Sequence, residues 1–296
     1  MQEPSGPTDF RQTRANLHQF TSVPELPEVE RASRLLARAA MGKSIDAVRA
    51  IHPALRRKLP PARARLARGK RIDRIERRGK HQLLHLDSGD TIVVHFRMNG
   101  DWEIGTTADP LDRFARGVID LTDGTRISLV DPRALSSITI DREGSSSLPP
   151  LGREASDPAL DAEYLLDALR RKKIAIKPAL MDQSVLAGLG NIYAAEALWE
   201  AEMDPRQASH TVTRGQLEKL VTAIRLVLNP RKRRPGRYSE TRNRNRFAVY
   251  DREGKICRRC GGTIARIVQA GRSTYYCASC QTAKRRASPS PRATRP

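Results

Sequence analysis

Residues 81–100 read HQLLHLDSGDTIVVHFRMNG, and this stretch decides the fold of the first half of the chain. Two apolar runs flank the Ser-Gly-Asp sequence at 88–90, and a turn signal between two such runs predicts a β-hairpin. Residues 118–131, VIDLTDGTRISLVD, predict a second hairpin with an Asp-Gly turn at 123–124. Because the whole of 44–140 alternates between short strands and turns, we expect an antiparallel sandwich or barrel there.

A helix is predicted before this β region, and an irregular connection is predicted after it. From Pro27 onward, apolar residues recur at three- and four-residue spacing until the Met-Gly-Lys sequence at 41–43 ends the pattern. Residues 141–158 read DREGSSSLPPLGREASDP, a composition typical of a connection between domains. Residues 1–22 show no apolar periodicity, so we expect them to lack structure.

Helical periodicity resumes after the connection. The segments LDAEYLLDALRRK, IKPALMDQSVLAG, NIYAAEALWEAEM and RGQLEKLVTAIRLVL begin at residues 160, 176, 191 and 214. Only Leu189-Gly190 separates the second from the third, which predicts a helical hairpin in which Gly188 closes one helix and Asn191 caps the next. Exposed amides at such a turn attract phosphate oxygens, although packing is the simpler interpretation of the motif by itself.

All four cysteines lie close to the C-terminus, as CRRC at 257–260 and CASC at 277–280. Two C-x2-C pairs at this separation suit a tetrahedral structural zinc site, and four unrelated free thiols are the disfavoured alternative. We therefore predict one structural Zn²⁺ with four protein ligands, which leaves no open position for catalysis. The expected ligands are Cys257, Cys260, Cys277 and Cys280, with a hairpin between the two pairs.

The chain is strongly basic, with 54 Lys and Arg against 33 Asp and Glu and a net charge of +21. This excess favours a polyanionic partner, nucleic acid first and an anionic membrane surface second. No apolar run approaches the roughly 20 residues needed to span a bilayer. Residues 1–22 contain no apolar signal core, so we expect a cytoplasmic protein that associates with the nucleoid rather than a membrane. The basic tail 282–296 is expected to be disordered.

Six motifs occur in an order that resembles the formamidopyrimidine-DNA glycosylase and endonuclease VIII family of base-excision repair enzymes. They are PELPEVE at 24–30, RRGKHQLL around Lys80, VVHFRMNG, DPR, GLGNIYAAE and the closing four-cysteine finger. The resemblance covers residues 24–281 and implies an α+β fold. In that fold an N-terminal antiparallel β-sandwich flanked by helices precedes a helix–two-turn–helix domain and a zinc finger, with DNA in the cleft between the two domains.

The resemblance also implies where the domains begin and end. We expect an extension outside the fold at 1–23, a catalytic sandwich domain at 24–143, a linker at 144–158, a helix–two-turn–helix domain at 159–246, a finger at 247–281 and the tail at 282–296. The expected partner is duplex DNA that contains oxidised bases or abasic sites, and the expected state is a monomer.

Members of the family use an N-terminal proline as nucleophile, and the matching residue is Pro24. A free prolyl nitrogen is a secondary amine that can attack C1′ of a damaged nucleoside and form a Schiff base. Glu25 would act as general acid on the sugar ring oxygen, and Lys80 would contact phosphate and assist. Glu28 would lie near the damaged nucleotide. Elimination on both sides of the sugar would follow, which makes the expected activity that of a glycosylase and lyase.

A flipped base leaves a gap in the duplex, which family members fill with a wedge of Met, Arg and Phe. Met98 and Arg133 match the first two positions. The family pattern continues Arg-Phe-Gly, whereas this chain has Ala-Leu-Ser at 134–136, so Leu135 stands where the aromatic wedge is expected. The full set of implied DNA contacts is Lys80, Glu28, His95, Met98, Arg133, Lys177, Asn191 and Arg272.

The two branches of the family prefer different classes of lesion, and this sequence matches neither branch in full. Members that prefer 8-oxoguanine carry a Gly-Gly loop before the finger, but residues 229–246 read NPRKRRPGRYSETRNRNR and lack that pair. The endonuclease VIII branch, which prefers oxidised pyrimidines, usually opens PEGPEI rather than PELPEV. The opening motif therefore favours the formamidopyrimidine branch, with the pyrimidine branch as the alternative.

The chemistry requires a free nitrogen at Pro24, because an internal proline nitrogen is a tertiary amide without a nucleophilic lone pair. We expect Val23 to mark the true start, as a GTG codon read as Met and then removed. Proteolytic removal of a leader is the alternative. If Pro24 stays internal, the chain would instead be a damage-binding protein without chemistry. A general zinc-finger nucleic-acid protein would bind undamaged and damaged DNA equally well.

Overall fold

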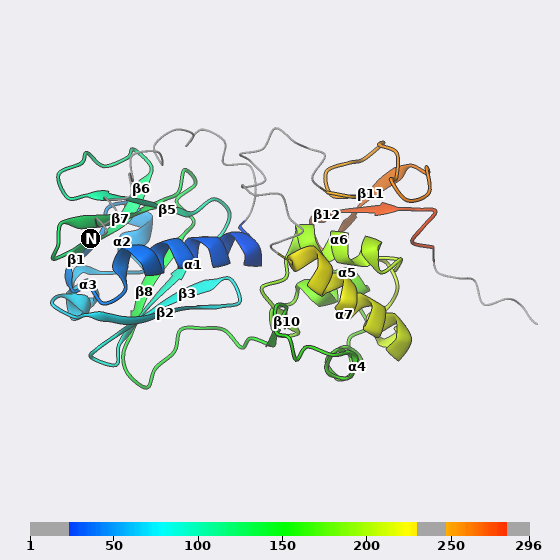
Figure 1. Ribbon diagram of the computed structural model, residues 1–296, viewed down its shortest axis with the longest axis horizontal. Helices are drawn as coiled ribbons and strands as arrows, with labels where there is room; N and C mark the ends of the chain where they lie inside the picture. Colours follow the sequence, from blue (N-terminus) through cyan, green and yellow to red (C-terminus); the bar gives the residue numbers. More distant parts are fainter. Residues whose placement is uncertain (1–23, 230–246, 283–296) are drawn as a thin grey trace, which may run out of the picture. The chain divides into compact units, whose positions relative to one another are not determined.

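The computed structural model describes residues 24–229 and 247–282, which form two compact units (Figure 1). The described residues divide into a first unit of 24–155 and 186–189, and a second unit of 156–185, 190–229 and 247–282. The predicted extension before Pro24, the loop expected to govern lesion choice and the tail after Thr282 lie outside the described residues. The expected domain boundaries stay a prediction.

The first unit is an antiparallel β-sandwich of two four-stranded sheets, ordered β1-β6-β7-β5 and β2-β3-β4-β8. The strands are β1 (Ile45–Ala50), β2 (Ile72–Arg78), β3 (His81–Leu86), β4 (Thr91–His95), β5 (Asp101–Thr106), β6 (Ala115–Leu121), β7 (Thr125–Val130) and β8 (Ser137–Asp141). Both predicted hairpins are confirmed, as β3–β4 and β6–β7. The predicted α+β class is confirmed as well.

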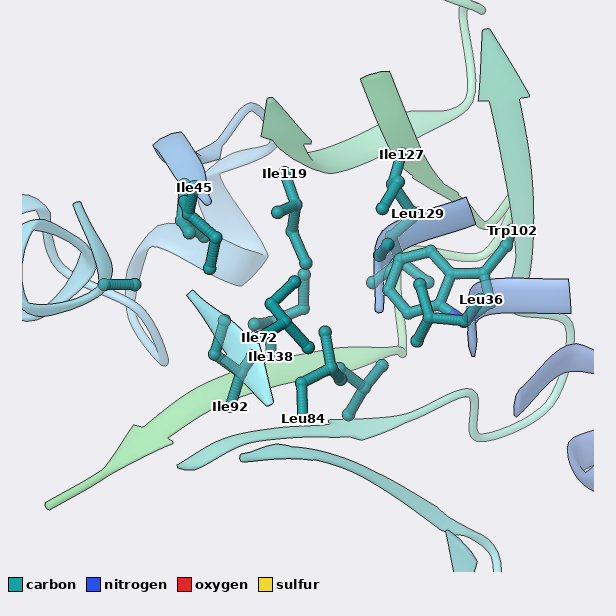
Figure 2. Packing of buried hydrophobic residues seen from close by; sticks show 14 of the residues in the cluster. Leu36, Ile45, Ile72, Leu84, Ile92, Trp102, Ile119, Ile127, Leu129 and Ile138 are labelled. Atoms are coloured by element: carbon teal, nitrogen blue, oxygen red, sulfur yellow. The ribbon is translucent and has the colours of Figure 1, made fainter. Parts of the chain in front are cut away.

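The apolar faces of the two sheets meet in one core, and helix α1 (Leu26–Ala40) completes it. Figure 2 shows side chains of both sheets and of the helix packed together; its labels include Ile119, Ile127, Leu129, Leu84, Ile92, Ile138, Trp102 and Leu36. Each fully buried Leu or Ile stabilises the unit by about 1.5–3 kcal/mol. Because α1 packs against strands of both sheets, the start of this helix is held in a fixed place.

The chain between β1 and β2 was expected as strands and turns, and this expectation was wrong. It forms the short helices α2 (Pro53–Arg56), α3 (Pro61–Ala64) and η2 (Arg65–Ala67). Both α2 and α3 begin with proline, whose fixed φ is suited to the first turn of a helix. Their apolar side chains at Leu55, Leu59, Ala64 and Ala67 are buried in the core of the sandwich.

The second unit is helical and ends in the finger hairpin. Its elements are α4 (Ala162–Leu169), α5 (Ile176–Met181), α6 (Asn191–Glu200), η3 (Ser209–Thr211), α7 (Arg214–Leu228), β11 (Ile264–Gln269) and β12 (Arg272–Cys277). Helix α7 covers the predicted segment from end to end, because Thr213 and Gln216 form a capping box at its start. Within the described residues, every helix is too short or too polar to cross a membrane.

The helical hairpin predicted around Gly188 was wrong in two respects. Helix α5 ends at Met181, because the Asp182 carboxylate accepts from the Ser184 amide at 2.9 Å and the Ser184 hydroxyl at 2.6 Å and turns the chain. Asn191 is the first residue of α6, and Gly190 occupies the capping position before it.

Between these helices, the chain crosses to the first unit. Strand β10 (Leu186–Ala187) pairs in parallel with β9 (Arg153–Glu154). Gly188 comes next with a φ of 89°, and its carbonyl accepts from the Leu26 amide at 3.3 Å. A Cβ built on Gly188 would lie 2.5 Å from Leu26 Cδ1 and 3.1 Å from Leu26 Cγ. Only glycine fits here, and the turn therefore fixes the start of α1.

Gly188→Ala is expected to destabilise the first unit by about 2–4 kcal/mol, from the left-handed backbone and the collision with buried Leu26. Gly42→Ala is the matched control, because Gly42 has a similar φ of 76° but nothing within 4 Å of a built Cβ. Urea unfolding followed by Trp102 fluorescence in a Trp199→Phe background reports the first unit alone. Equal losses in the two variants would contradict a steric constraint at Gly188.

Candidate active site and nucleic-acid interface

Two of the residues expected to do the chemistry, Pro24 and Glu25, lie at the start of α1. Pro24 is half-buried directly before the helix, and Glu25, 1% exposed, is its capping residue. The Glu28 carboxylate accepts from the Glu25 amide at 3.2 Å, as part of a capping box. The local sequence explains the arrangement, because Glu at the capping position and three residues later, with Pro27 in the first turn, favours a helix start here.

Lys80 lies in the turn between β2 and β3, and the Glu154 carboxylate holds that turn. Glu154 Oε1 accepts from the Gly79 amide at 2.6 Å and from Arg78 Nη1 at 2.6 Å. Arg78 Nη2 also donates to the carbonyls of Leu151 (3.1 Å) and Gly152 (2.6 Å). The connection after the sandwich is therefore hydrogen-bonded to the backbone beside Lys80.

Arg77 joins this turn to α1. Its side chain is 9% exposed and forms ion pairs with Glu154 and, through Nε at 2.9 Å, with Glu30 of the helix. Burial alone would raise the pKa of Glu30, but the hydrogen bonds from Arg77 and Arg34 lower it below its ordinary value. One network therefore links the helix after Pro24, the turn that carries Lys80 and the connection at 151–154.

His95 lies at the end of β4, where its ring meets the ring of His81 edge-on with centroids 4.6 Å apart. The Arg97 amide donates to His95 Nδ1 at 2.8 Å, which assigns the ring proton to Nε2. Burial first, and then the charges of His81, Arg97, Lys80 and Lys58, lower the pKa of His95 to about 3. At neutral pH the ring is uncharged and offers one N–H donor.

Two of the predicted wedge residues, Met98 and Leu135, directly follow unusual backbone positions. The φ angle is 55° at Arg97 and 53° at Ala134, a region that residues other than glycine seldom adopt. The chain then presents Met98, 37% exposed, and Leu135, 39% exposed. Arg133 is exposed beside Ala134. Two apolar side chains and one cation thus stand at the surface, where sequence reasoning expected the wedge.

Asp131, which is completely buried, shapes the wedge loop, defined here as residues 131–136. Its carboxylate accepts from the amides of Arg133 (2.9 Å), Leu135 (2.8 Å) and Ser136 (2.8 Å). The Ser136 hydroxyl lies 2.6 Å from Asp131 Oδ2 and 3.1 Å from the Phe96 carbonyl oxygen. The serine that replaces the family's glycine therefore ties the wedge loop to the loop that carries Met98.

In the second unit, the Lys177 ammonium group organises the remaining predicted phosphate contacts. Lys177 is 1% exposed, and its Nζ donates to Asn191 Oδ1 at 2.5 Å and Thr274 Oγ1 at 2.8 Å. Asn191 Nδ2 in turn donates to the Ser273 carbonyl at 3.1 Å, beside exposed Arg272. Asn191 and the start of β12 are thus brought together, and this geometry gives Lys177 a positioning role rather than an exposed contact.

The four cysteines form one cluster, with all Sγ atoms within 4.8 Å of one another. The Sγ atoms of Cys257 and Cys280 lie 3.8 Å apart, and those of Cys260 and Cys277 lie 3.5 Å apart. Tetrahedral Zn²⁺ with Zn–S bonds of about 2.3 Å requires sulfur separations of about 3.8 Å. The donor set therefore fits zinc, and the predicted hairpin between the pairs is confirmed as β11–β12.

Glu196 is a structural support that sequence reasoning missed. Its buried carboxylate on α6 accepts from the amides of Ala248 (2.8 Å), Val249 (2.9 Å) and Tyr250 (2.9 Å). Burial raises the pKa of Glu196, against the three amides that lower it. The chain that leads into the finger is thereby fixed to the helix that begins with Asn191. A single acid inside the apolar run IYAAEALW was the available signal.

Comparison with known proteins identifies the domains. Family models for the formamidopyrimidine-DNA glycosylase N-terminal domain, its H2TH domain and the zinc finger found in FPG and IleRS match residues 23–138, 151–234 and 254–283. Formamidopyrimidine-DNA glycosylase of Erythrobacter litoralis is 38% identical over 275 residues, which cover 88% of this chain and 100% of that protein.

Two solved structures show the same fold with DNA bound. The Lactococcus lactis formamidopyrimidine-DNA glycosylase in complex with DNA that contains an abasic site is 28% identical, with a TM-score of 0.79. A MutM complex with DNA containing carbocyclic 8-oxo-G has the same identity, 28%, and the same TM-score, 0.79. Each match covers 88% of this chain and 100% of the solved one.

Glu154→Gln is expected to lower the free energy of unfolding of the first unit by about 1.5–3 kcal/mol, because charge-assisted hydrogen bonds are lost around buried Arg77. Glu76→Gln is the control: Glu76 also pairs with an arginine, but its side chain is 37% exposed, and its loss is expected to cost less than about 1 kcal/mol. Urea unfolding with Trp102 fluorescence measures both. If Glu154→Gln is no worse than the control, the network does not stabilise the unit.

Proposed function

The chain belongs to the formamidopyrimidine-DNA glycosylase family, and from this premise we propose that it excises oxidised bases from DNA and then cuts the strand at the abasic site. One observation carries the proposal. The helix start with Pro24 and Glu25 and the turn with Lys80 are joined in one unit by the paired side chains of Arg77 and Glu154. A nucleophile, an acid and a phosphate-binding cation on rigid supports are the groups that this reaction needs.

The proposed reaction begins at the nitrogen of Pro24. Its lone pair forms a bond to C1′ as the bond from C1′ to the base breaks, and the base leaves with a proton. Glu25 gives a proton to the sugar ring oxygen, the ring opens, and an iminium links the protein to the sugar. Loss of a C2′ proton then expels the 3′ phosphate, and a second elimination expels the 5′ phosphate.

Each unit supplies its own proposed contacts to the DNA backbone. Lys80 would bind phosphate through charge, whereas neutral His95 would donate one hydrogen bond from Nε2. Asn191 and Arg272 would form the corresponding pair in the second unit, with Lys177 holding Asn191 in place. Two neighbours are glycosylases solved with DNA that contains an abasic site or carbocyclic 8-oxo-G, which supports damaged duplex DNA as the partner.

Met98, Leu135 and Arg133 would fill the gap left by the flipped base. Two apolar side chains, each more than one-third exposed, gain by entering the base stack, since water is removed from them there. A leucine in place of an aromatic wedge fills less of the gap by stacking. Glu28 would lie close to the extruded nucleotide, because it is in the first turn of the helix that Glu25 caps.

The preferred lesion is proposed to be an oxidised purine, on the strength of the opening motif PELPEVE, with oxidised pyrimidines as the alternative. Damage binding without chemistry is the second candidate function. It is favoured by one specific fact: in a chain that keeps Val23, the nitrogen of Pro24 is a tertiary amide.

The nucleophile is tested by comparing a form whose chain begins at Pro24 with the form that begins at Met1. Borohydride reduction with an abasic-site duplex is expected to trap a covalent adduct with the first form only. Both forms are expected to bind the same duplex, so binding is the internal control. Equal trapping of both forms would exclude Pro24 as the nucleophile, and no trapping by either would exclude the lyase.

One Zn²⁺ per chain is proposed at the cysteine cluster, where it would stabilise the finger fold without taking part in the reaction. Cys260→Ala is expected to lose the metal, as read by native mass spectrometry, and to weaken binding to an abasic-site duplex. Ser279→Ala, in the opposite pair of the cluster, is expected to keep both. Retention of full zinc content by Cys260→Ala would contradict the four-thiol site.

A further inference from the structure

A short segment of the first unit carries an unusual charge pattern. The basic segment, residues 53–68, reads PALRRKLPPARARLAR, and no acidic residue occurs between Asp46 and Asp73. Four of its apolar side chains, Leu55, Leu59, Ala64 and Ala67, are buried in the sandwich core, and its six cations are exposed. The cations are Arg56, Arg57, Lys58, Arg63, Arg65 and Arg68.

Several other surface cations of the same unit pair with acidic neighbours. Lys43 pairs with Asp123 at 2.7 Å, Arg71 pairs with Asp73 at 2.7 Å, and Arg74 pairs with Glu76. Within the part of the chain that the structure describes, no cation of the basic segment makes an ion pair. Six like charges without counter-charges repel one another, and a polyanion would relieve that repulsion.

The basic segment lies directly against the wedge loop. Lys58 Nζ donates to the carbonyls of Leu135 at 3.2 Å and Ser136 at 3.3 Å, and Arg63 Nε donates to the Ile140 carbonyl at 2.6 Å. Burial, together with the charges of Arg97 and Arg57, lowers the pKa of Lys58, so these cations share one positive field. The segment is thus continuous with the loop proposed to enter DNA.

We propose that the basic segment is an additional duplex-binding surface, which holds the phosphate backbone beside the wedge loop without reading bases. Duplex DNA carries one charge per ~1.7 Å of its axis, so a row of unpaired cations releases condensed counterions on contact. The choice of DNA as partner rests on the proposed function, but the surface does not depend on the glycosylase chemistry. It would retain the protein on undamaged DNA between lesions.

Arg65→Gln/Arg68→Gln tests the surface, because no hydrogen bond or ion pair within the described residues involves either side chain. Binding to an undamaged duplex is measured over a series of salt concentrations. The slope of log affinity against log salt is expected to become shallower by about 1–2, since each lost phosphate contact removes about 0.9. Arg71→Gln/Arg74→Gln is the control, which removes two exposed arginines that are already paired.

Equal slopes for the two double variants would overturn the proposal and would mean that only net charge matters. The charge-retaining variant Arg65→Lys/Arg68→Lys is expected to keep the parental slope, and a loss there would point to misfolding rather than lost charge. Trapping by the form that begins at Pro24 is measured in parallel. If the parent protein traps no adduct, the proposed function fails, while the slope comparison still decides the surface.

Discussion

The Glu154 carboxylate is the constraint on which the first unit depends. It accepts from Arg77, Arg78 and the Gly79 amide, and Arg77 has little access to water. A guanidinium that is 9% exposed needs acceptors, because a buried charge without a partner costs several kcal/mol. If the connection at 151–154 left the sandwich, Arg77 would lose its partner Glu154 at this cost in free energy. The connection is therefore held in place, and the strand pair β9–β10 is held with it.

This constraint explains how distant parts of the sequence come to support one site. Arg77 reaches Glu30 on α1, and β10 delivers Gly188 to the amide of Leu26. The start of α1 is thus fixed from two sides, by an ion pair one turn along the helix and by a backbone hydrogen bond at its first residue. The proposed nucleophile, Pro24, would therefore lose little further freedom when substrate binds, which is the source of most of the advantage of an oriented reaction.

The sequence predicted those features whose causes are local. The hairpins β3–β4 and β6–β7 arise from turn residues, and α7 arises from its capping box. The length of α5 could not be predicted from local sequence. Asp182 turns the chain after this helix, and β10 then pairs in parallel with the distant strand β9. The residues proposed for chemistry came from motifs. Their supports did not, since partly or fully buried acids such as Glu154, Asp131 and Glu196 look like surface charges in a sequence.

The net charge of +21 is a weak guide to where DNA binds, whereas the pairing of the charges is a strong one. Most carboxylates near β1, β2 and α1 form ion pairs with arginines of the same unit. The positive and negative charges of these pairs therefore cancel locally. The basic segment has no such partners among the described residues. His95 differs again, because burial keeps it neutral and limits it to one directed hydrogen bond. Long-range attraction and local positioning of phosphates are therefore assigned to different residues, and salt should weaken the first far more than the second.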